Sequence, residues 1–252
     1  MPEFPSDGIG LSYSVEGEGP PVLLIHGFAS TGAINWVDTG WVSALVAAGY
    51  RTIRFDNRGH GDSRKLYDPQ LYYAHEMAED ARRLLDYLGI GRAAVIGYSM
   101  GARIAAFLAL RHPDRVAAAV FGGMGMNLIH GLEDSQAIIS ALQAEDPALI
   151  RSATGQMFRR FADATKSDRA ALAACMIHSR EPMAEDEVRR IKVPVLVAAG
   201  SADSMAGSPS ALAALLPQGE AFVIEGRDHM KATGDRSFKV AAIAFLARQP
   251  GW

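Results

Sequence analysis

Short runs of apolar residues recur along the chain and predict the strands of its core. The clearest runs are VLLI at 22–25, AAVI at 93–96, VAAAVF at 116–121, VPVLVAA at 193–199 and AFVI at 221–224. They do not alternate with polar positions, which is typical of strands buried on both faces of a parallel sheet. The segment LSYSVEG at 11–17 does alternate, and it predicts an antiparallel edge strand.

Segments of helical length and spacing lie between these runs. They cover about 38–48, 74–88, 100–111, 207–216 and 235–248. The segment 74–88 places five apolar side chains on one face of a helix. Alternating strands and helices predict βαβ units with right-handed crossovers. We therefore expect an α/β fold with a doubly wound, mostly parallel sheet that helices cover.

One interval is too long for this alternation of strands and helices, because about 70 residues separate the VAAAVF run from the VPVLVAA run. A single crossover helix needs about half that length. Amphipathic stretches such as QAIISALQ and AALAACMIHS predict three or four short helices there rather than a structureless loop. We interpret residues 123–190 as a helical lid within a single domain that spans residues 1–252. The alternative is that these helices simply pack on the body of the domain.

Composition and charge argue against several classes of partner. The 252 residues include 25 basic and 28 acidic side chains, a net charge of −3. The chain therefore lacks the excess of positive charge that binds nucleic acid or an anionic membrane. The apolar runs are far shorter than the roughly 18–20 residues that cross a bilayer. Cys175 is the one cysteine, so the chain can build neither a disulfide framework nor a cysteine-based metal site.

Targeting and cofactor motifs are missing as well. The segment MPEFPSDGIG lacks the basic region and the apolar run of a secretory signal, so we expect a cytoplasmic location. No phosphate loop occurs, no GxGxxG follows a strand, and His75-Glu76 lacks the second histidine of a zincin helix because position 79 is Glu. We expect no cofactor and no metal ion. The sequence leaves the oligomeric state open.

The sharpest motif is Gly97-Tyr98-Ser99-Met100-Gly101, which directly follows the AAVI run and opens a helical segment. A nucleophile elbow requires this strand, turn and helix context. A turn sharp enough to expose the Ser99 hydroxyl has strained backbone angles, and side chains at positions 97 and 101 would collide with the neighbouring strand and helix. The helix that begins beneath Ser99 also directs backbone N–H groups at a developing oxyanion.

A serine nucleophile needs a base, which is in turn oriented by a carboxylate. His229 follows the last strand, whereas the six other histidines come too early for the chain order serine, acid, histidine that belongs with this elbow. Asp203 lies just beyond the VPVLVAA run and projects from the same edge of the sheet. Asp228 is the rival acid, but adjacent side chains diverge. We predict that Ser99, His229 and Asp203 are the nucleophile, the base and the acid.

These motifs together resemble the α/β-hydrolase superfamily over essentially the whole chain. The resemblance also includes His26-Gly27-Phe28 after an early strand and DNRGHGDS at 56–63 after the next strand. It implies the α/β-hydrolase fold, with a small helical cap inserted after the sixth strand. The cap would shape the substrate pocket, and the DNRGHGDS segment would be a marker of the fold rather than a reactive site.

The resemblance also assigns the oxyanion hole. In this family, the residue after His-Gly and the residue after the nucleophile donate their backbone N–H groups to it, which here are Phe28 and Met100. His26 would hold the oxyanion loop through hydrogen bonds. A serine at the nucleophile position argues against epoxide hydrolase and haloalkane dehalogenase chemistry, in which a carboxylate forms an alkyl-enzyme. Acyl transfer is the chemistry that remains.

The sequence gives less information about the substrate than about the catalytic residues. Trp36, Met124 and Met230 are our candidates for substrate binding, and Phe158 and Phe161 are candidate apolar residues of the lid. We expect a cofactor-free serine hydrolase that acts on small-molecule carboxylic esters. The alternatives are a lactone or C–C bond hydrolase, a polyester depolymerase and a perhydrolase-like enzyme. A ligand receptor with this fold is the non-enzymatic alternative.

Overall fold

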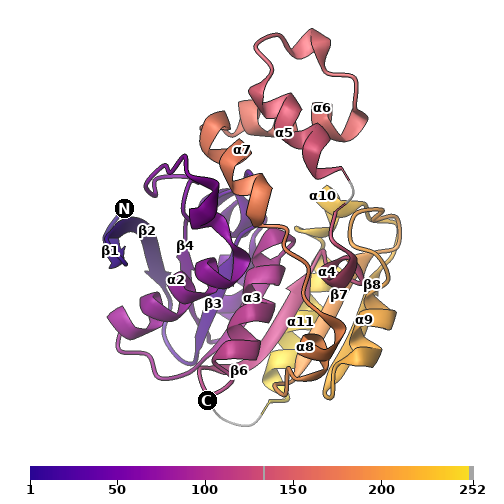
Figure 1. Cartoon of the computed structure of the whole chain (residues 1–252). Coiled ribbons are helices and arrows are strands. Elements are labelled where there is room, and N and C mark those ends of the chain that lie inside the picture. Colours follow the sequence, from indigo (N-terminus) through magenta and orange to yellow (C-terminus); the bar gives the residue numbers. More distant parts are fainter. Residues whose placement is uncertain (133, 250–252) are drawn as a thin grey trace.

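One eight-stranded sheet forms the centre of the molecule in the computed structural model, which describes residues 1–132 and 134–249 (Figure 1). Its strands are β1 (Glu3–Ser6), β2 (Ile9–Glu16), β3 (Pro21–Ile25), β4 (Arg51–Phe55), β5 (Ala93–Tyr98), β6 (Val116–Gly122), β7 (Val195–Gly200) and β8 (Gly219–Ile224). They lie in the order β1-β2-β4-β3-β5-β6-β7-β8. The pairs β1·β2 and β2·β4 are antiparallel and the other neighbours are parallel, so the sheet is mostly parallel, as predicted.

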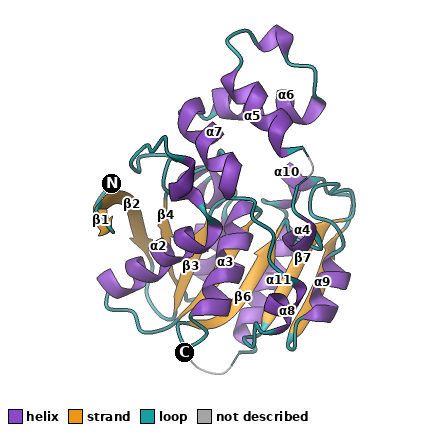
Figure 2. Ribbon diagram, viewed as in Figure 1, coloured by secondary structure: helices purple, strands orange, loops and turns teal. Residues whose placement is uncertain are grey.

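Helices cover both faces of this sheet (Figure 2). One face carries α2 (Ala74–Tyr87), α3 (Met100–Arg111) and α9 (Pro209–Leu215), and the other carries α1 (Trp41–Ala47) and α11 (Arg236–Ala247). Strand residues alternate between the two layers: Leu23 and Ile25 join the core under α2 and α3, whereas Val22 and Leu24 join the core under α1 and α11. Because both faces are buried, the central strands are apolar at every position.

The interval between β6 and β7 is helical. It contains α4 (Asn127–His130), α5 (Ser135–Gln143), the 3-10 turn Pro147–Leu149, α6 (Ala153–Ala164), α7 (Arg169–His178) and α8 (Glu185–Arg189). The helices α5, α6 and α7 lie beyond the carboxyl ends of the strands, at the top of Figure 1. In contrast, α8 packs beside α3 and α9 on the body. The interval therefore contributes both to the body and to a separate helical layer above it.

Local signals explain where these helices begin. The Asp168 carboxylate accepts hydrogen bonds from the Ala170 and Ala171 N–H groups at the start of α7, each at 3.0 Å. The Ser152 hydroxyl accepts one from Gly155 N at the start of α6, at 3.1 Å. Such side chains satisfy N–H groups that have no partner within the helix.

The structure differs from the predicted elements in three places. The strand β1 was not expected, because its four residues EFPS are too few for a periodic signal. The helix expected at 38–48 begins at Trp41, after a separate π-helical turn at Ala33–Val37 and Gly40 with φ +77°. A short helix, α10 (His229–Ala232), follows β8. Within the described residues, no helix is both long and apolar enough to cross a bilayer.

Candidate active site

Ser99 lies in a tight turn between β5 and α3. Its φ angle is +52°, a conformation that residues other than glycine rarely adopt, and its N–H donates to Gly122 O at 2.8 Å. A Cβ at Gly97 would lie 2.2 Å from Gly101 O, and one at Gly101 would lie 1.9 Å from Ile25 O. Backbone crowding therefore requires glycine at both positions, for the steric reason that the motif predicts.

The structure brings Ser99, His229 and Asp203 into one hydrogen-bonded chain at the carboxyl edge of the sheet. His229 Nε2 lies 3.0 Å from Ser99 Oγ, and His229 Nδ1 lies 2.8 Å from Asp203 Oδ2. The other oxygen of Asp203 accepts from Met205 N at 2.9 Å and from Ala206 N at 3.1 Å, which holds the carboxylate in place. The Asp203 side chain is fully buried, and Ser99 is 6% exposed.

Asp228, the rival acid, is turned away from the imidazole. It caps α10, where its carboxylate accepts from Lys231 N at 2.8 Å and lies 3.2 Å from the Lys231 ammonium group. The hydrogen bond from the Lys231 backbone lowers the pKa of Asp228. The side chain of Asp228 therefore serves its own helix, and of these two carboxylates Asp203 is the one that reaches His229.

The loop that carries Phe28 is held against the nucleophile turn. His26 Nδ1 donates to Gly27 O at 2.8 Å, and His26 Nε2 accepts from Asn57 N at 2.9 Å. Burial lowers the pKa of His26, so its imidazole is neutral in this network. A Cβ at Gly27 would lie 3.6 Å from Ser99 Cβ, which shows how closely this loop approaches the nucleophile turn.

The two N–H groups expected to form the oxyanion hole flank Ser99. Met100 is the first residue of the twelve-residue helix α3, so its N–H lies at the positive end of the helix dipole. Phe28 lies in the turn Gly27–Ser30, in which Ala29 adopts φ +58°. In the described part of the chain, neither N–H has a backbone acceptor. Neither N–H is thus used by the backbone of the fold, as the expected role of an oxyanion donor requires.

Comparison with known proteins places this geometry in a family. The family model for the alpha/beta hydrolase fold matches residues 20–145, half of the chain. The chain belongs to the α/β-hydrolase family. A hydrolase from Pseudomonas aeruginosa has the same architecture, with a TM-score of 0.79 and 26% identity over 97% of each chain. An enol-lactonase from Burkholderia xenovorans shares the fold, with a TM-score of 0.77 and 23% identity over 98% of this chain and 100% of that one.

Curated relatives match a shorter stretch of this α/β hydrolase. An epoxide hydrolase from Caballeronia sordidicola is 39% identical over 120 residues, which is 48% of this chain and 35% of the relative. Epoxide hydrolase 2 from Siraitia grosvenorii is 37% identical over 118 residues, or 46% of this chain and 35% of the relative. The matched stretches thus span about a third of the length of these relatives.

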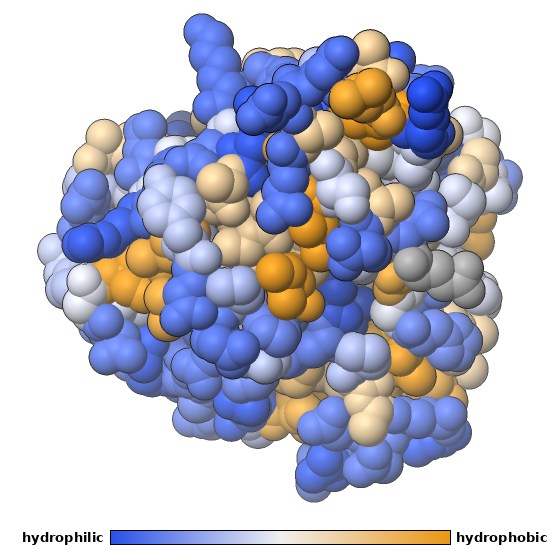
Figure 3. All heavy atoms as spheres, turned by 45° about the horizontal axis from the view of Figure 1, so that its top comes forward, coloured by the Kyte–Doolittle hydropathy of each residue, from blue (hydrophilic) through white to orange (hydrophobic). Residues whose placement is uncertain are grey.

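A cavity with an empty volume of about 590 Å³ opens onto Ser99 and His229 in this α/β hydrolase. Phe158 and Phe161 of α6 line it, as does Phe28. Its other lining residues, most of which the sequence analysis missed, are Gly27, Ser30, Ile34, Asn35, Thr39, Tyr98, Met230 and Thr233. The face turned forward in Figure 3 is mostly hydrophilic, with apolar side chains in separate small groups. Of the three phenylalanines that line the cavity, Phe28 and Phe158 are buried, each 4% exposed, and Phe161 is half-buried.

The three predicted substrate-binding residues have different positions. Met230 lines the large cavity, and Met124 lines a smaller one that also touches Ser99. The prediction for Trp36 is wrong, because its ring is fully buried in the core under α1 and packs edge-on against Trp41 at 5.8 Å. The turn Ala33–Val37 directs Ile34 and Asn35 toward the cavity and the next side chain away from it. Helical rotation decides this orientation.

Cys175 and His60 near the site have structural surroundings. Burial raises the pKa of the Cys175 thiol to about 12, and its Sγ lies 3.8 Å from Met100 Sδ, so Cys175 packs between the helical layer and the elbow. Burial lowers the pKa of His60 to about 3. In the part of the chain that the structure describes, no group of three His, Cys, Asp or Glu residues could hold a metal ion.

Proposed function

We propose that this α/β hydrolase cleaves small-molecule carboxylic esters without a cofactor, through an acyl-enzyme on Ser99. The observation that carries the proposal is the chain of hydrogen bonds from Ser99 through His229 to Asp203, at 3.0 and 2.8 Å, where an apolar cavity ends. A serine activated in this way is a nucleophile for a carbonyl carbon.

The first half of the reaction forms the acyl-enzyme. Ser99 Oγ attacks the ester carbonyl carbon as its proton passes to His229 Nε2. Asp203 keeps the proton on Nδ1, so that Nε2 is the free base, and then stabilises the imidazolium. The carbonyl oxygen becomes an oxyanion that the Phe28 and Met100 N–H groups bind. The C–O bond to the alcohol then breaks, and His229 protonates the leaving oxygen.

The second half releases the acid. His229 Nε2 removes a proton from water, whose oxygen attacks the acyl carbon, and the second oxyanion occupies the same hole. The bond to Ser99 Oγ then breaks, and the proton returns to that oxygen. The products are a carboxylic acid and an alcohol, and the enzyme is unchanged.

We propose that residues 123–190 act as the cap of the single domain 1–252. The two phenylalanines that α6 contributes to the cavity support this role. A second support is the Thr165 hydroxyl at the end of α6, which lies 3.1 Å from Ala29 O in the oxyanion loop. The helical layer therefore both walls the substrate cavity and contacts the loop that carries Phe28.

The chemistry of Ser99 separates this proposal from epoxide hydrolysis, the activity in the names of the matched curated relatives. Attack by a serine oxygen on an epoxide carbon would form an ether. Water activated by His229 hydrolyses an acyl ester, because a carbonyl carbon accepts the attack, but an ether offers no such carbon. An epoxide opened by Ser99 would therefore stay bound to the enzyme as an ether, and the enzyme would not turn over.

A fluorophosphonate probe tests the nucleophile directly. We expect labelling of the wild-type protein and none of the Ser99→Ala variant, because the probe phosphorus bonds to an activated serine oxygen. A wild-type protein that is neither labelled nor active on p-nitrophenyl acetate or butyrate would favour a ligand receptor and exclude the proposal.

The bond type needs a substrate panel. Short-chain, long-chain and polymeric esters, lactones and a substrate with a hydrolysable C–C bond should be compared at equal enzyme concentration. We expect the highest kcat/KM on a small ester. A lactone or C–C substrate that exceeds every ester would replace the ester assignment and leave the role of Ser99 intact.

A further inference from the structure

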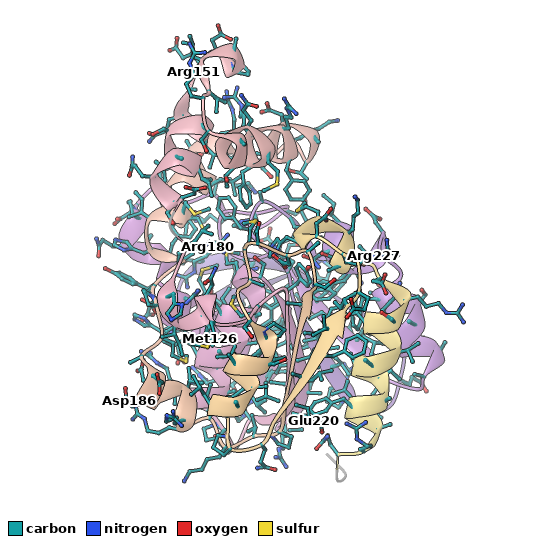
Figure 4. The ribbon with its side chains drawn as sticks, turned by 90° about the vertical axis from the view of Figure 1, so that its right-hand side faces the viewer. Met126, Arg151, Arg180, Asp186, Glu220 and Arg227 are labelled. Carbon is teal, nitrogen blue, oxygen red and sulfur yellow. The ribbon has the colours of Figure 1, made fainter. Side chains whose placement is uncertain are left out.

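A second cavity touches Ser99 and His229 and has a different character from the first. It is small, because its space of about 260 Å³ includes open solvent, and two arginines, Arg103 and Arg180, line it together with Met124. Figure 4 shows Arg180 between the helical layer and the body. No acidic residue of the described chain lines this cavity. Cationic groups therefore dominate the space beside the nucleophile.

Arg180 is a partly buried cation that no carboxylate of the described residues pairs with. Within the described residues, its Nε and Nη2 atoms are enclosed and have no hydrogen-bond partner. Its Cζ atom lies 5.7 Å from the centre of the Phe28 ring, which provides a favourable face but no counter-charge. Burial lowers the pKa of Arg180 to about 10, so the guanidinium remains charged at neutral pH.

Arg103 adds a second positive charge that only neutral groups bind. Its Nη1 donates to Leu128 O and Glu181 O, each at 2.7 Å, and its Nη2 donates to Asn127 O at 2.6 Å. The Glu181 carboxylate is directed to His75 Nδ1 instead, at 2.7 Å. Burial and the nearby Arg180 lower the pKa of Arg103 to about 9. Neither guanidinium is therefore neutralised by a carboxylate in the described part of the chain.

An unpaired buried charge opposes folding, because desolvation is not offset by an ion pair. Arg103 is held by backbone carbonyls that join α3 to the interval after β6, which accounts for it structurally. Arg180 has no such bonds within the described residues, and its side chain lines the cavity that also touches Ser99. A planar anion that accepts two N–H groups is the ligand that a guanidinium binds best.

We propose that this cavity binds a free carboxylate of the substrate through Arg180, so that the enzyme acts on carboxylate-bearing esters. The inference rests on the proposed function and names the substrate class of the same site. The carboxylate lies on one side of the scissile bond, in the small cavity. The apolar part of the substrate lies on the other side, against Phe158 and Phe161.

The kinetic test compares an acid with its neutral isostere. The substrates are the monobutyl esters of succinic, glutaric and adipic acid and the butyl esters of the matching monoamides. For at least one chain length, we expect the wild type to prefer the acid by about 10–100-fold in kcat/KM, the range of charge-assisted hydrogen bonds. Arg180→Met should bring this ratio close to one, and Arg180→Lys should retain part of it.

Arg189→Met is the matched control, because Arg189 lies on α8 with 54% of its side chain exposed. It should keep the wild-type ratio. Thermal unfolding checks the fold of Arg180→Met, which should be at least as stable as the wild type because an unpaired charge is removed. A wild-type ratio at or below one for all three acids would overturn the proposal. So would a loss of the same factor on acid and amide in Arg180→Met.

A binding measurement separates this proposal from the ester assignment. Titration of glutarate and monobutyl glutarate into Ser99→Ala by calorimetry needs no turnover. We expect binding that disappears in the Ser99→Ala, Arg180→Met double variant. If the wild type hydrolyses no ester but this pattern holds, the proposed function fails and the carboxylate site stands. If esters are hydrolysed but neither ligand binds in an Arg180-dependent way, the carboxylate site fails alone.

Discussion

Asp203 lies 2.8 Å from His229 through its Oδ2 atom, whereas the carboxylate of Asp228, next to His229 in sequence, accepts from Lys231 N at the start of its own helix. Chain neighbours of a base are often poorly placed to orient it, because adjacent side chains point in different directions. Asp203 comes from the end of a separate strand, so its carboxylate approaches the imidazole from the side opposite Ser99. This geometry gives the acid assignment a direct test.

Asp203→Asn should reduce kcat by a factor on the order of 10⁴, because an amide no longer stabilises the imidazolium or fixes the correct tautomer. Asp228→Asn should reduce kcat by about tenfold or less, since it weakens only the cap of α10. Steady-state kinetics on p-nitrophenyl butyrate measures both variants. Equal losses, or a larger loss in Asp228→Asn, would show that Asp203 is not the acid.

Gly101→Ala should destabilise the protein by about 1–3 kcal/mol and reduce activity, because its Cβ would lie 1.9 Å from the Ile25 carbonyl oxygen. Backbone atoms cannot move aside as the end of a flexible side chain can. Gly91→Ala is the control, since a Cβ there meets nothing within 4 Å, and it should change the unfolding free energy by about 0.5 kcal/mol or less. Urea denaturation compares them. Equal stability of the two variants would contradict the crowding argument.

The burial of His60 predicts that the free energy of unfolding falls in acid. Its folded pKa is lowered to about 3 by burial, below the unfolded value of 6.5, so below pH 6.5 the unfolded chain binds a proton that the folded chain does not. Stability is unaffected by His60 above that pH and falls as the pH decreases from 6.5 toward 3. Between pH 7 and pH 5 this group alone should remove about 2 kcal/mol of unfolding free energy.

The His60→Asn variant isolates that effect, because asparagine can still donate to Arg58 O, the partner of His60 Nδ1 at 2.9 Å. We expect the difference in unfolding free energy between pH 7 and pH 5 to shrink by about 2 kcal/mol in the variant. His130→Asn, on the short helix α4, serves as the control. An unchanged pH dependence in His60→Asn would show that His60 is protonated in the folded protein.

Phe161→Ala tests the wall that α6 contributes to the large cavity. Loss of the ring removes apolar contact, so kcat/KM on p-nitrophenyl butyrate should fall by about 3–10-fold, and the preferred acyl chain should become longer as the cavity widens. Leu149→Ala is a matched control, because this side chain is 65% exposed and lies outside the cavity. A chain-length profile identical to that of the wild type would mean that α6 does not contact the acyl group.

The sequence predicted the fold and the three residues that the structure joins by hydrogen bonds, because their signals are local or follow chain order. The run AAVI followed by Gly97 and Ser99 specifies a strand, a strained turn and a helix within a few residues. Strand order then requires the acid and the base to follow at the ends of later strands, which selects Asp203 and His229. The position of the helical interval followed from the spacing of two apolar runs.

Only the tertiary structure decided which side chains face the substrate. Trp36 and Ile34 lie two residues apart, yet one is buried in the core and the other lines the cavity, because rotation about the helical turn points their side chains in different directions. Arg180 is distant in sequence from both Phe28 and Ser99, and its missing partner becomes apparent only when α7, α3 and the oxyanion loop are packed together. Chemistry that depends on contacts between remote segments leaves no periodic pattern in the sequence, and the unpaired guanidinium beside Ser99 is such a case.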